Sequence, residues 1–169
     1  MQKVSLVALR TLIGWHFAYE GLYKLSLPGW SRAGDRLPAW SAAGYLNAAG
    51  GPLGDLFRDL AGSGALAWID VLVPVGLLLV GLSLLLGLAT QIGCWGAIAF
   101  LTLFYLSAIP TTGTPQPGTE GSYLLVSKNL IELVAVVAVL VFRTGRMAGL
   151  DLLVRRRTTA PPVRTVEAP

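Results

Sequence analysis

The fold is decided by one long apolar stretch in the middle of the chain. Residues 71–109 read VLVPVGLLLVGLSLLLGLATQIGCWGAIAFLTLFYLSAI, without a single charged side chain. The short sequence Ala89-Thr90-Gln91 divides this stretch into two runs, each about long enough to cross a hydrocarbon core of roughly 30 Å as a helix. Because the connection between the runs is so short, we expect two antiparallel helices that pack as a hairpin.

The composition of the whole chain agrees with a membrane protein. Of the 169 residues, 54% are hydrophobic and only 13% are charged, and the mean hydropathy is +0.65. A soluble domain of this length has too little interior to bury so many apolar runs. The composition therefore indicates an integral membrane protein of one domain.

We expect an all-α fold, an integral membrane four-helix bundle with an interfacial helix in the first outer loop. Residues 1–157 would form the transmembrane domain, and residues 158–169 a disordered basic tail. The four predicted membrane helices are Val4–Leu25, Trp68–Leu88, Ile92–Ile109 and Leu124–Phe142.

The first outer loop, Leu27–Gly64, contains one apolar pattern with helical spacing, formed by Leu53, Leu56, Phe57 and Leu60. Two interpretations stay open: an anchor lying on the membrane surface, or a lid over a site in the bundle. A second surface helix is predicted after Phe142, from the spacing of Met147, Leu150, Leu153 and Val154.

The positive charge of the chain is confined to its last segment. From Arg143 onward the net charge is +4, which equals that of the whole chain, so the preceding part is neutral. A basic flank directly after a membrane helix indicates the cytoplasmic side, with attraction to anionic lipid as a second effect. We therefore expect a cell (inner) membrane protein with both termini in the cytoplasm, the lipid bilayer as its partner, and no nucleic-acid binding.

Cys94 is the only cysteine and His16 the only histidine. A single copy of the chain therefore cannot form a disulfide, a CxxC redox pair or a bis-histidine haem site. We expect no metal or haem ligated by the protein. If the protein handles electrons, the redox group must come from a bound small molecule or from a partner subunit.

The first apolar stretch nevertheless carries ionisable side chains, each of which costs roughly 2.5–3.5 kcal/mol at membrane depth and normally needs a partner. Arg10, Gly14, Phe17, Gly21 and Lys24 fall on one helical face. For Arg10 we expect an anchor at lipid phosphates. The glycines would let a neighbouring helix approach closely.

Two polar groups are expected to meet in the outer half of the bundle. Glu20 precedes Lys24 by four residues, which favours an ion pair, and His16 could donate a hydrogen bond to Glu20 as part of a proton relay. Facing them, Lys128, Asn129 and Glu132 open the last helix. These side chains would form either a closed structural network or a ligand site, to which Tyr105 and Tyr123 would add hydroxyl groups, unless these only form an aromatic belt.

The order of several motifs resembles a known membrane family. The motifs are Trp15–Leu25, Gly81–Leu88, Glu120–Leu124, Lys128–Glu132 and Thr144–Arg146, with shorter matches at Trp30-Ser31, Gly44–Leu46, Tyr105–Ser107 and Gly149–Asp151. They are similar to the DoxX-like family, most of all to its DoxD type, the small subunit of thiosulfate:quinone oxidoreductase. The resemblance implies a four-helix membrane bundle associated with sulfur-compound or quinone redox chemistry. Gln91 departs from the basic residue expected there.

Three functions follow as alternatives. The first is a membrane subunit of a quinone-linked oxidoreductase that binds quinone or a small sulfur oxyanion in the outer half of the bundle, together with a second redox subunit or another copy of itself. The second is a non-catalytic scaffold that recruits a redox partner protein. The third is a small-solute transporter, which the absence of an inverted repeat disfavours.

Overall fold

The computed structural model describes residues 1–26, 39–50, 52–108, 122–123 and 125–152. In these residues the fold is all-α apart from one small hairpin. The helices are α1 (Gln2–Ser26), α2 (Ala43–Asn47), α3 (Gly54–Ala61), α4 (Leu66–Leu86), α5 (Thr90–Ser107), α6 (Lys128–Val141) and the 3-10 helix η2 (Thr144–Arg146), and the strands are β1 (Ser122–Tyr123) and β2 (Val126–Ser127).

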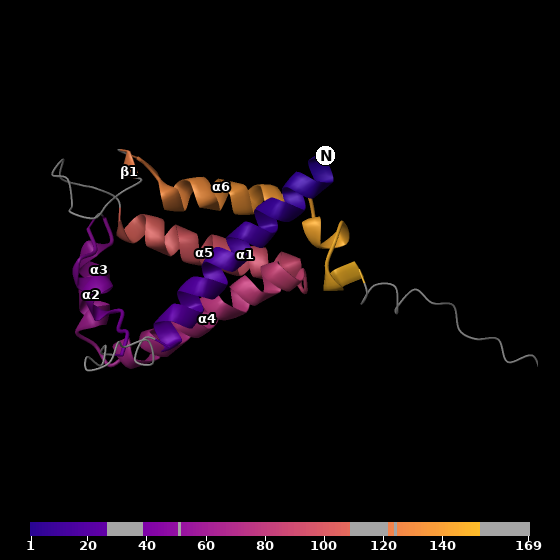
Figure 1. Cartoon of the computed structure of the whole chain (residues 1–169). Helices are drawn as coiled ribbons and strands as arrows, with labels where there is room; N and C mark the ends of the chain where they lie inside the picture. Colours follow the sequence, from indigo (N-terminus) through magenta and orange to yellow (C-terminus); the bar gives the residue numbers. More distant parts are fainter. Residues whose placement is uncertain (27–38, 51, 109–121, 124, 153–169) are drawn as a thin grey trace, which may run out of the picture.

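The four longest helices form one bundle. α1 packs along α4, α5 packs on both α4 and α6, and the short helices α2 and α3 cover one end (Figure 1). We call this the loop end, and the opposite end, where the α4–α5 connection and η2 lie, the turn end. By length and composition, α4 and α5 are able to cross a membrane.

The contact between α1 and α4 is close because glycines form it. A Cβ added to Gly81 would lie 2.2 Å from Ala18 N, and one added to Gly21 would lie 2.4 Å from Leu78 N. The predicted face of the first helix is confirmed, since its residues Arg10, Gly14, Phe17 and Gly21 are buried. Residues from all four helices complete the core, among them Phe17, Leu84, Cys94, Ala97 and Val136.

The predicted hairpin of α4 and α5 is confirmed, and its turn is very tight. Gly87 ends α4 with φ 63°, and Ala89 precedes α5 with φ 50°. Gly87 must also stay without a side chain, because a Cβ there would lie 2.8 Å from Gly149 Cα. The turn is therefore in contact with the last described segment of the chain.

The predicted start of the last helix at Leu124 was wrong. The residues before α6 form a hairpin in which Ser122 pairs with Ser127, and Tyr123 with Val126. Ser127 is extended and its hydroxyl accepts a hydrogen bond from Leu130 N, which fixes the start of α6 at Lys128. A serine cap of this kind satisfies one of the free amide groups of the first helical turn.

The predicted helix in the first loop is confirmed as α3, and its two expected roles, an anchor on the membrane surface or a lid over the bundle, stay predictions. Phe57 is buried, in one cluster with Ala42 and Leu46 of the α2 segment and with Ile69 of α4. Asp70, near the start of α4, accepts a hydrogen bond of 2.6 Å from Ala42 N. The α2–α3 layer is thus bound to the end of the bundle by its own apolar face.

After α6 the chain turns back across the turn end. η2 is followed by a turn at residues 147–149 and by helical residues 150–152. Part of the predicted second surface helix therefore belongs to residues 143–152, which fold back onto the turn end. We call these residues the folded-back segment. Leu153 and Val154, the domain boundary at residue 157 and the predicted tail lie outside the described residues.

Candidate functional site

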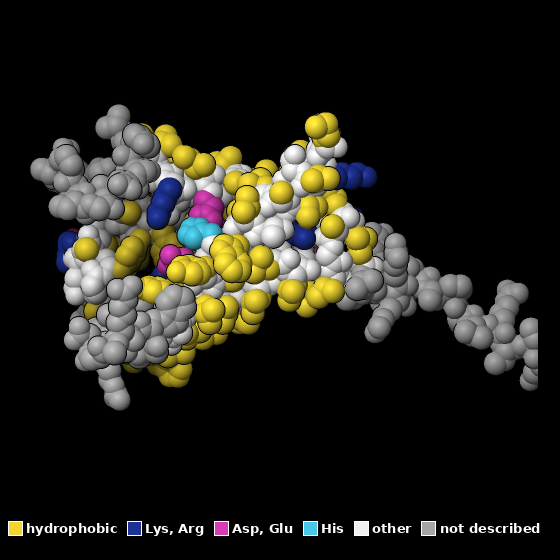
Figure 2. All heavy atoms as spheres, in the orientation of Figure 1, with side chains coloured by type: hydrophobic (Ala, Val, Ile, Leu, Met, Phe, Trp, Pro, Cys, Tyr) yellow, Lys and Arg dark blue, Asp and Glu magenta, His cyan; other side chains and the backbone are white. Residues whose placement is uncertain are grey.

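A row of ionisable side chains crosses from α1 to α6 in the half of the bundle next to the loop end. This loop-end row consists of Lys24, Glu20, His16, Glu132 and Lys128. Figure 2 shows the histidine of the chain beside acidic side chains, with hydrophobic side chains on the adjoining surface. The row therefore opens on the side of the bundle and is not enclosed in its core.

The centre of the row is a hydrogen bond between the two helices. His16 Nδ1 donates to Glu132 Oε1 at 2.8 Å, with 45% of the His16 side chain and 15% of the Glu132 side chain exposed. The sequence predicted Glu20 as the partner of His16. That assignment was wrong because the side chain of His16 reaches across to α6 instead of along α1.

The predicted ion pair within α1 is confirmed. Lys24 Nζ donates to Glu20 Oε2, and Lys24 is the more buried of the two side chains, with 18% exposed against 41%. The ammonium group also lies 5.7 Å from the centre of the Trp40 ring, within the range of a cation–π interaction. Lys24 therefore joins the row to the segment that leads into the α2–α3 layer.

The closed network of four charges, one of the two alternatives expected from the sequence, does not form among the described residues. Lys128 is exposed and has no ion pair there, although its charge is close enough to act on His16. Asn129, beside it, is half-buried. The row thus contains two separate pairs and an exposed ammonium group at one end.

The structure describes the side chain of one of the two tyrosines predicted for the site. The hydroxyl of Tyr105 donates to Leu125 O at 2.8 Å, which ties α5 to the hairpin before α6, and the side chain of Tyr123 lies outside the described residues. Tyr45 makes a contact with α5 that the sequence did not predict. Its hydroxyl shares a hydrogen bond of 2.7 Å with Ser107 Oγ; burial raises the pKa of Tyr45, against the opposite effect of this bond.

A second cluster of charges lies at the turn end, and here the prediction for Arg10 was wrong. Arg10 is only 3% exposed, so it is not a lipid anchor. Its Nη1 donates to Ala148 O at 2.6 Å and to Thr144 O at 3.3 Å. Arg10 thus holds the folded-back segment against α1. The helical periodicity, which placed Arg10 on the buried face of the helix, predicted its position correctly.

Asp151 supplies the other half of this turn-end latch, by which we mean Arg10, Asp151 and the backbone groups that they bind. Its carboxylate accepts hydrogen bonds from Ala89 N at 2.7 Å and Thr90 N at 3.1 Å, at the start of α5. Burial alone would raise the pKa of Asp151, but the bonds from Thr90 and Ala89 and the charge of Arg10 hold it below its usual value. Asp151 therefore caps the start of α5 from a distant part of the chain.

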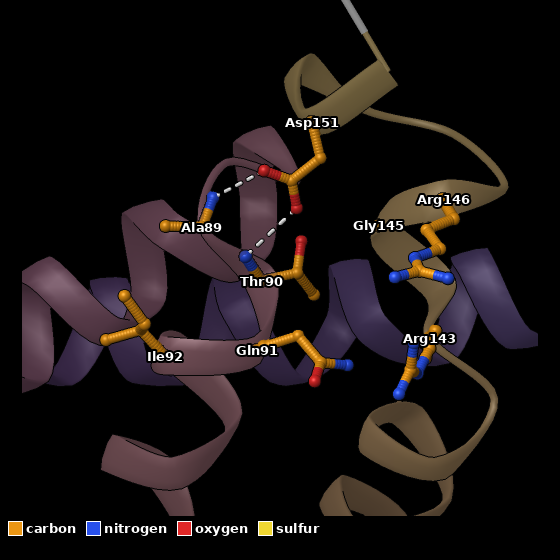
Figure 3. A pocket seen from close by; sticks show the side chains of 8 residues that line it. All are labelled: Ala89, Thr90, Gln91, Ile92, Arg143, Gly145, Arg146 and Asp151. Atoms are coloured by element: carbon orange, nitrogen blue, oxygen red, sulfur yellow. Dashed lines mark hydrogen bonds between the residues drawn. The ribbon is translucent and has the colours of Figure 1, made fainter. Parts of the chain in front are cut away.

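A cavity of about 290 Å³ lies beside the latch. Figure 3 shows residues of the α4–α5 turn and α5 on one side of it and arginines of the folded-back segment on the other. Its lining residues are Ala89, Thr90, Gln91, Ile92, Arg143, Gly145, Arg146 and Asp151. The sequence showed these arginines only as part of a basic flank.

Among the described residues, no three His, Cys, Asp or Glu side chains are grouped so that they could hold a metal ion. The side chains of the loop-end row can form hydrogen bonds, carry charge and exchange protons.

Comparison with known proteins gives no relative: no family model, no curated protein and no solved structure matches the chain. The resemblance to the DoxX-like family stays a prediction from the motifs.

Proposed function

We propose that the chain is a four-span membrane protein in which α1, α4, α5 and α6 cross the bilayer. The loop end would face outward and the turn end, followed by the basic flank, the cytoplasm. The apolar length of α4 and α5 supports this arrangement, as does the net charge of +4 carried from Arg143 onward.

In this arrangement the loop-end row lies at membrane depth. α6 has 14 residues and so rises about 21 Å, less than a hydrocarbon core of roughly 30 Å. If Arg143 marks the cytoplasmic boundary, Glu132 lies about 16 Å above it, slightly beyond the middle of the membrane. His16 and Glu132 would then be reached from the lipid phase, without passage through water.

The function that this geometry supports best is that of a quinone-binding membrane subunit of an oxidoreductase. The observation that carries it is the hydrogen bond between His16 and Glu132, on the side of the bundle and partly exposed. A quinone dissolves in lipid and presents carbonyl oxygens, which accept hydrogen bonds. Its reduction to quinol takes up two electrons and two protons, and His16 and Glu132 can each hold and pass on a proton. The electrons would come from a partner redox protein.

The charges of the row favour a neutral ligand over a small sulfur oxyanion such as thiosulfate. Glu132 binds His16 directly, and the charge of Glu20 also acts on it. An anion at the histidine would be close to both carboxylates, whereas a quinone carbonyl needs only a hydrogen-bond donor. The ammonium groups of Lys24 and Lys128 lie at the two ends of the row and balance the charges of the two carboxylates.

The proposal is tested by quinone titration of the purified chain in lipid nanodiscs, followed by tryptophan fluorescence. His16→Gln and Glu132→Gln are each expected to weaken binding about tenfold or more, the loss of one hydrogen bond that involves a charged group. Asp55→Asn is the matched control, because Asp55 lies in α3 and pairs with Arg58 outside the row. Equal affinity in all four proteins would refute the site.

A scaffold that recruits a redox partner is the second candidate. The observation in its favour is that Glu20 pairs with Lys24 and His16 with Glu132, as a purely structural role requires. Affinity capture from detergent separates the two functions. A stoichiometric redox partner, together with no quinone binding by the chain alone, would favour the scaffold.

A further inference from the structure

The cavity at the turn end is distinct from the loop-end row and carries its own charge pattern. Arg143 and Arg146 line it and are exposed, and Arg10 lies buried behind the same segment. The one carboxylate in the lining, Asp151, already accepts two backbone hydrogen bonds from the start of α5. Arg143 and Arg146 therefore leave the lining with an excess of positive charge.

The two arginines are held in place by the backbone that carries them. Arg143 has φ 48°, a left-handed conformation that turns the chain at the end of α6, and Arg146 N donates to Arg143 O at 2.9 Å. Between them, Gly145 lies so close to α5 that an added Cβ would be 2.4 Å from Thr90 Oγ1. The segment is thus pressed against α5, with both arginines beside the cavity (Figure 3).

The opposite side of the cavity is also fixed. Gln91 Nε2 donates to Leu140 O at 3.3 Å, which bridges α5 to α6. Ile92 follows in the lining and is 75% exposed. A pair of guanidinium groups thus shares one cavity with an apolar side chain on the outer surface of the bundle.

We propose that this cavity binds the phosphate headgroup of an anionic phospholipid. Arginine is suited to phosphate because its planar group donates two parallel hydrogen bonds. Ile92 would contact the upper part of the acyl chain, a contact that free phosphate cannot make. Basic pockets between membrane helices on the cytoplasmic side are suited to such headgroups.

The experiment measures lipid binding to the full chain in neutral detergent by native mass spectrometry, with phosphatidylglycerol as the probe. One bound lipid per chain is expected, at an affinity about tenfold or more above that of Arg143→Gln/Arg146→Gln. Lys3→Gln is the control for Arg146→Gln, because each removes one exposed positive charge at the same end of the bundle. If Arg146→Gln and Lys3→Gln weaken lipid binding equally, the proposed site is overturned.

Two further measurements keep the test independent of folding defects in the variants. In the unmodified chain, phosphatidylcholine should bind more weakly than phosphatidylglycerol, and millimolar inorganic phosphate should leave the bound phosphatidylglycerol in place. Displacement of the lipid by inorganic phosphate would overturn the lipid assignment and indicate a free-phosphate site. Equal binding of the two lipids would overturn the role of the arginines.

Discussion

The two ends of the bundle both hold charged side chains of α1, but these charges have different kinds of partners. At the turn end, Arg10 is buried and donates to backbone carbonyls, while Asp151 accepts from backbone amides. At the loop end, His16 and Lys24 bind the side chains of Glu132 and Glu20 and remain partly exposed. A latch made with the backbone holds the fold, whereas pairs of partly exposed side chains can exchange a partner for a ligand.

The difference between the two ends also bears on how charged residues in membrane helices are interpreted. Ionisable residues at membrane depth are by default candidates for a functional site. In the proposed membrane arrangement, Arg10 would carry this cost for structure, because its donors bind Thr144 and Ala148 of the folded-back segment. Burial and the type of partner decide between these cases; hydropathy alone does not.

The largest expected effect is at the turn end. Arg10→Leu should lower the free energy of unfolding by about 2–4 kcal/mol, because two carbonyl groups lose a charged donor in a buried place. Reversible unfolding in mixed micelles, followed by circular dichroism, measures this loss. Lys24→Leu removes the corresponding charge at the loop end, and an equal loss in both variants would erase the distinction between the ends.

The next effect tests how closely α1 and α4 must pack between the two ends. Gly81→Ala should cost about 1–3 kcal/mol, because its Cβ would overlap with the backbone of Ala18. Gly44→Ala is the control, since nothing lies within 4 Å of a Cβ at that position. An unchanged stability of Gly81→Ala would mean that α1 moves away from α4 at little cost.

A smaller effect, of about 1 kcal/mol at neutral pH, is expected for Asp151→Ala, the value of a helix cap. The pKa of Asp151 is lowered in the folded chain from 3.8. Its contribution is therefore complete above about pH 4 and is lost as the pH falls through the lower folded value. Unfolding measured from pH 7 to pH 2 should show the difference between the two proteins shrinking on acidification. A constant difference would argue against a charged cap.

The smallest effect is expected within the loop-end row. Glu20→Gln should change the free energy of unfolding by less than about 0.5 kcal/mol, because a partly exposed pair within one helix adds little. The same denaturation assay measures it. A loss above about 2 kcal/mol would make this pair as structural as the latch.

The sequence predicted most of the helical framework because its signals are local. The apolar runs identified α4 and α5, and the buried face of α1 followed from helical periodicity. The i,i+4 pair of Glu20 and Lys24 depends only on spacing along one helix, so it could also be predicted. The start of α6 was missed because a short hairpin precedes the helix, which begins only after its cap at Ser127.

The contacts between distant segments could not be predicted in this way. His16 had a suitable carboxylate one turn away in Glu20, and only the packing of α1 on α6 selects Glu132. Asp151 read as an isolated acidic residue in a basic flank, although it caps a helix more than sixty residues earlier. Both pairings depend on how the helices lie in three dimensions.

The latch has a consequence for how the chain is made. Arg10 is synthesised before its acceptor on Thr144, which follows 134 residues later. At about 5–20 residues per second, roughly 7–27 s pass between the two. During that time the guanidinium group lacks the carbonyl groups of Thr144 and Ala148, to which it donates in the folded chain. The contact between α1 and the folded-back segment can therefore form only after all four long helices have been made.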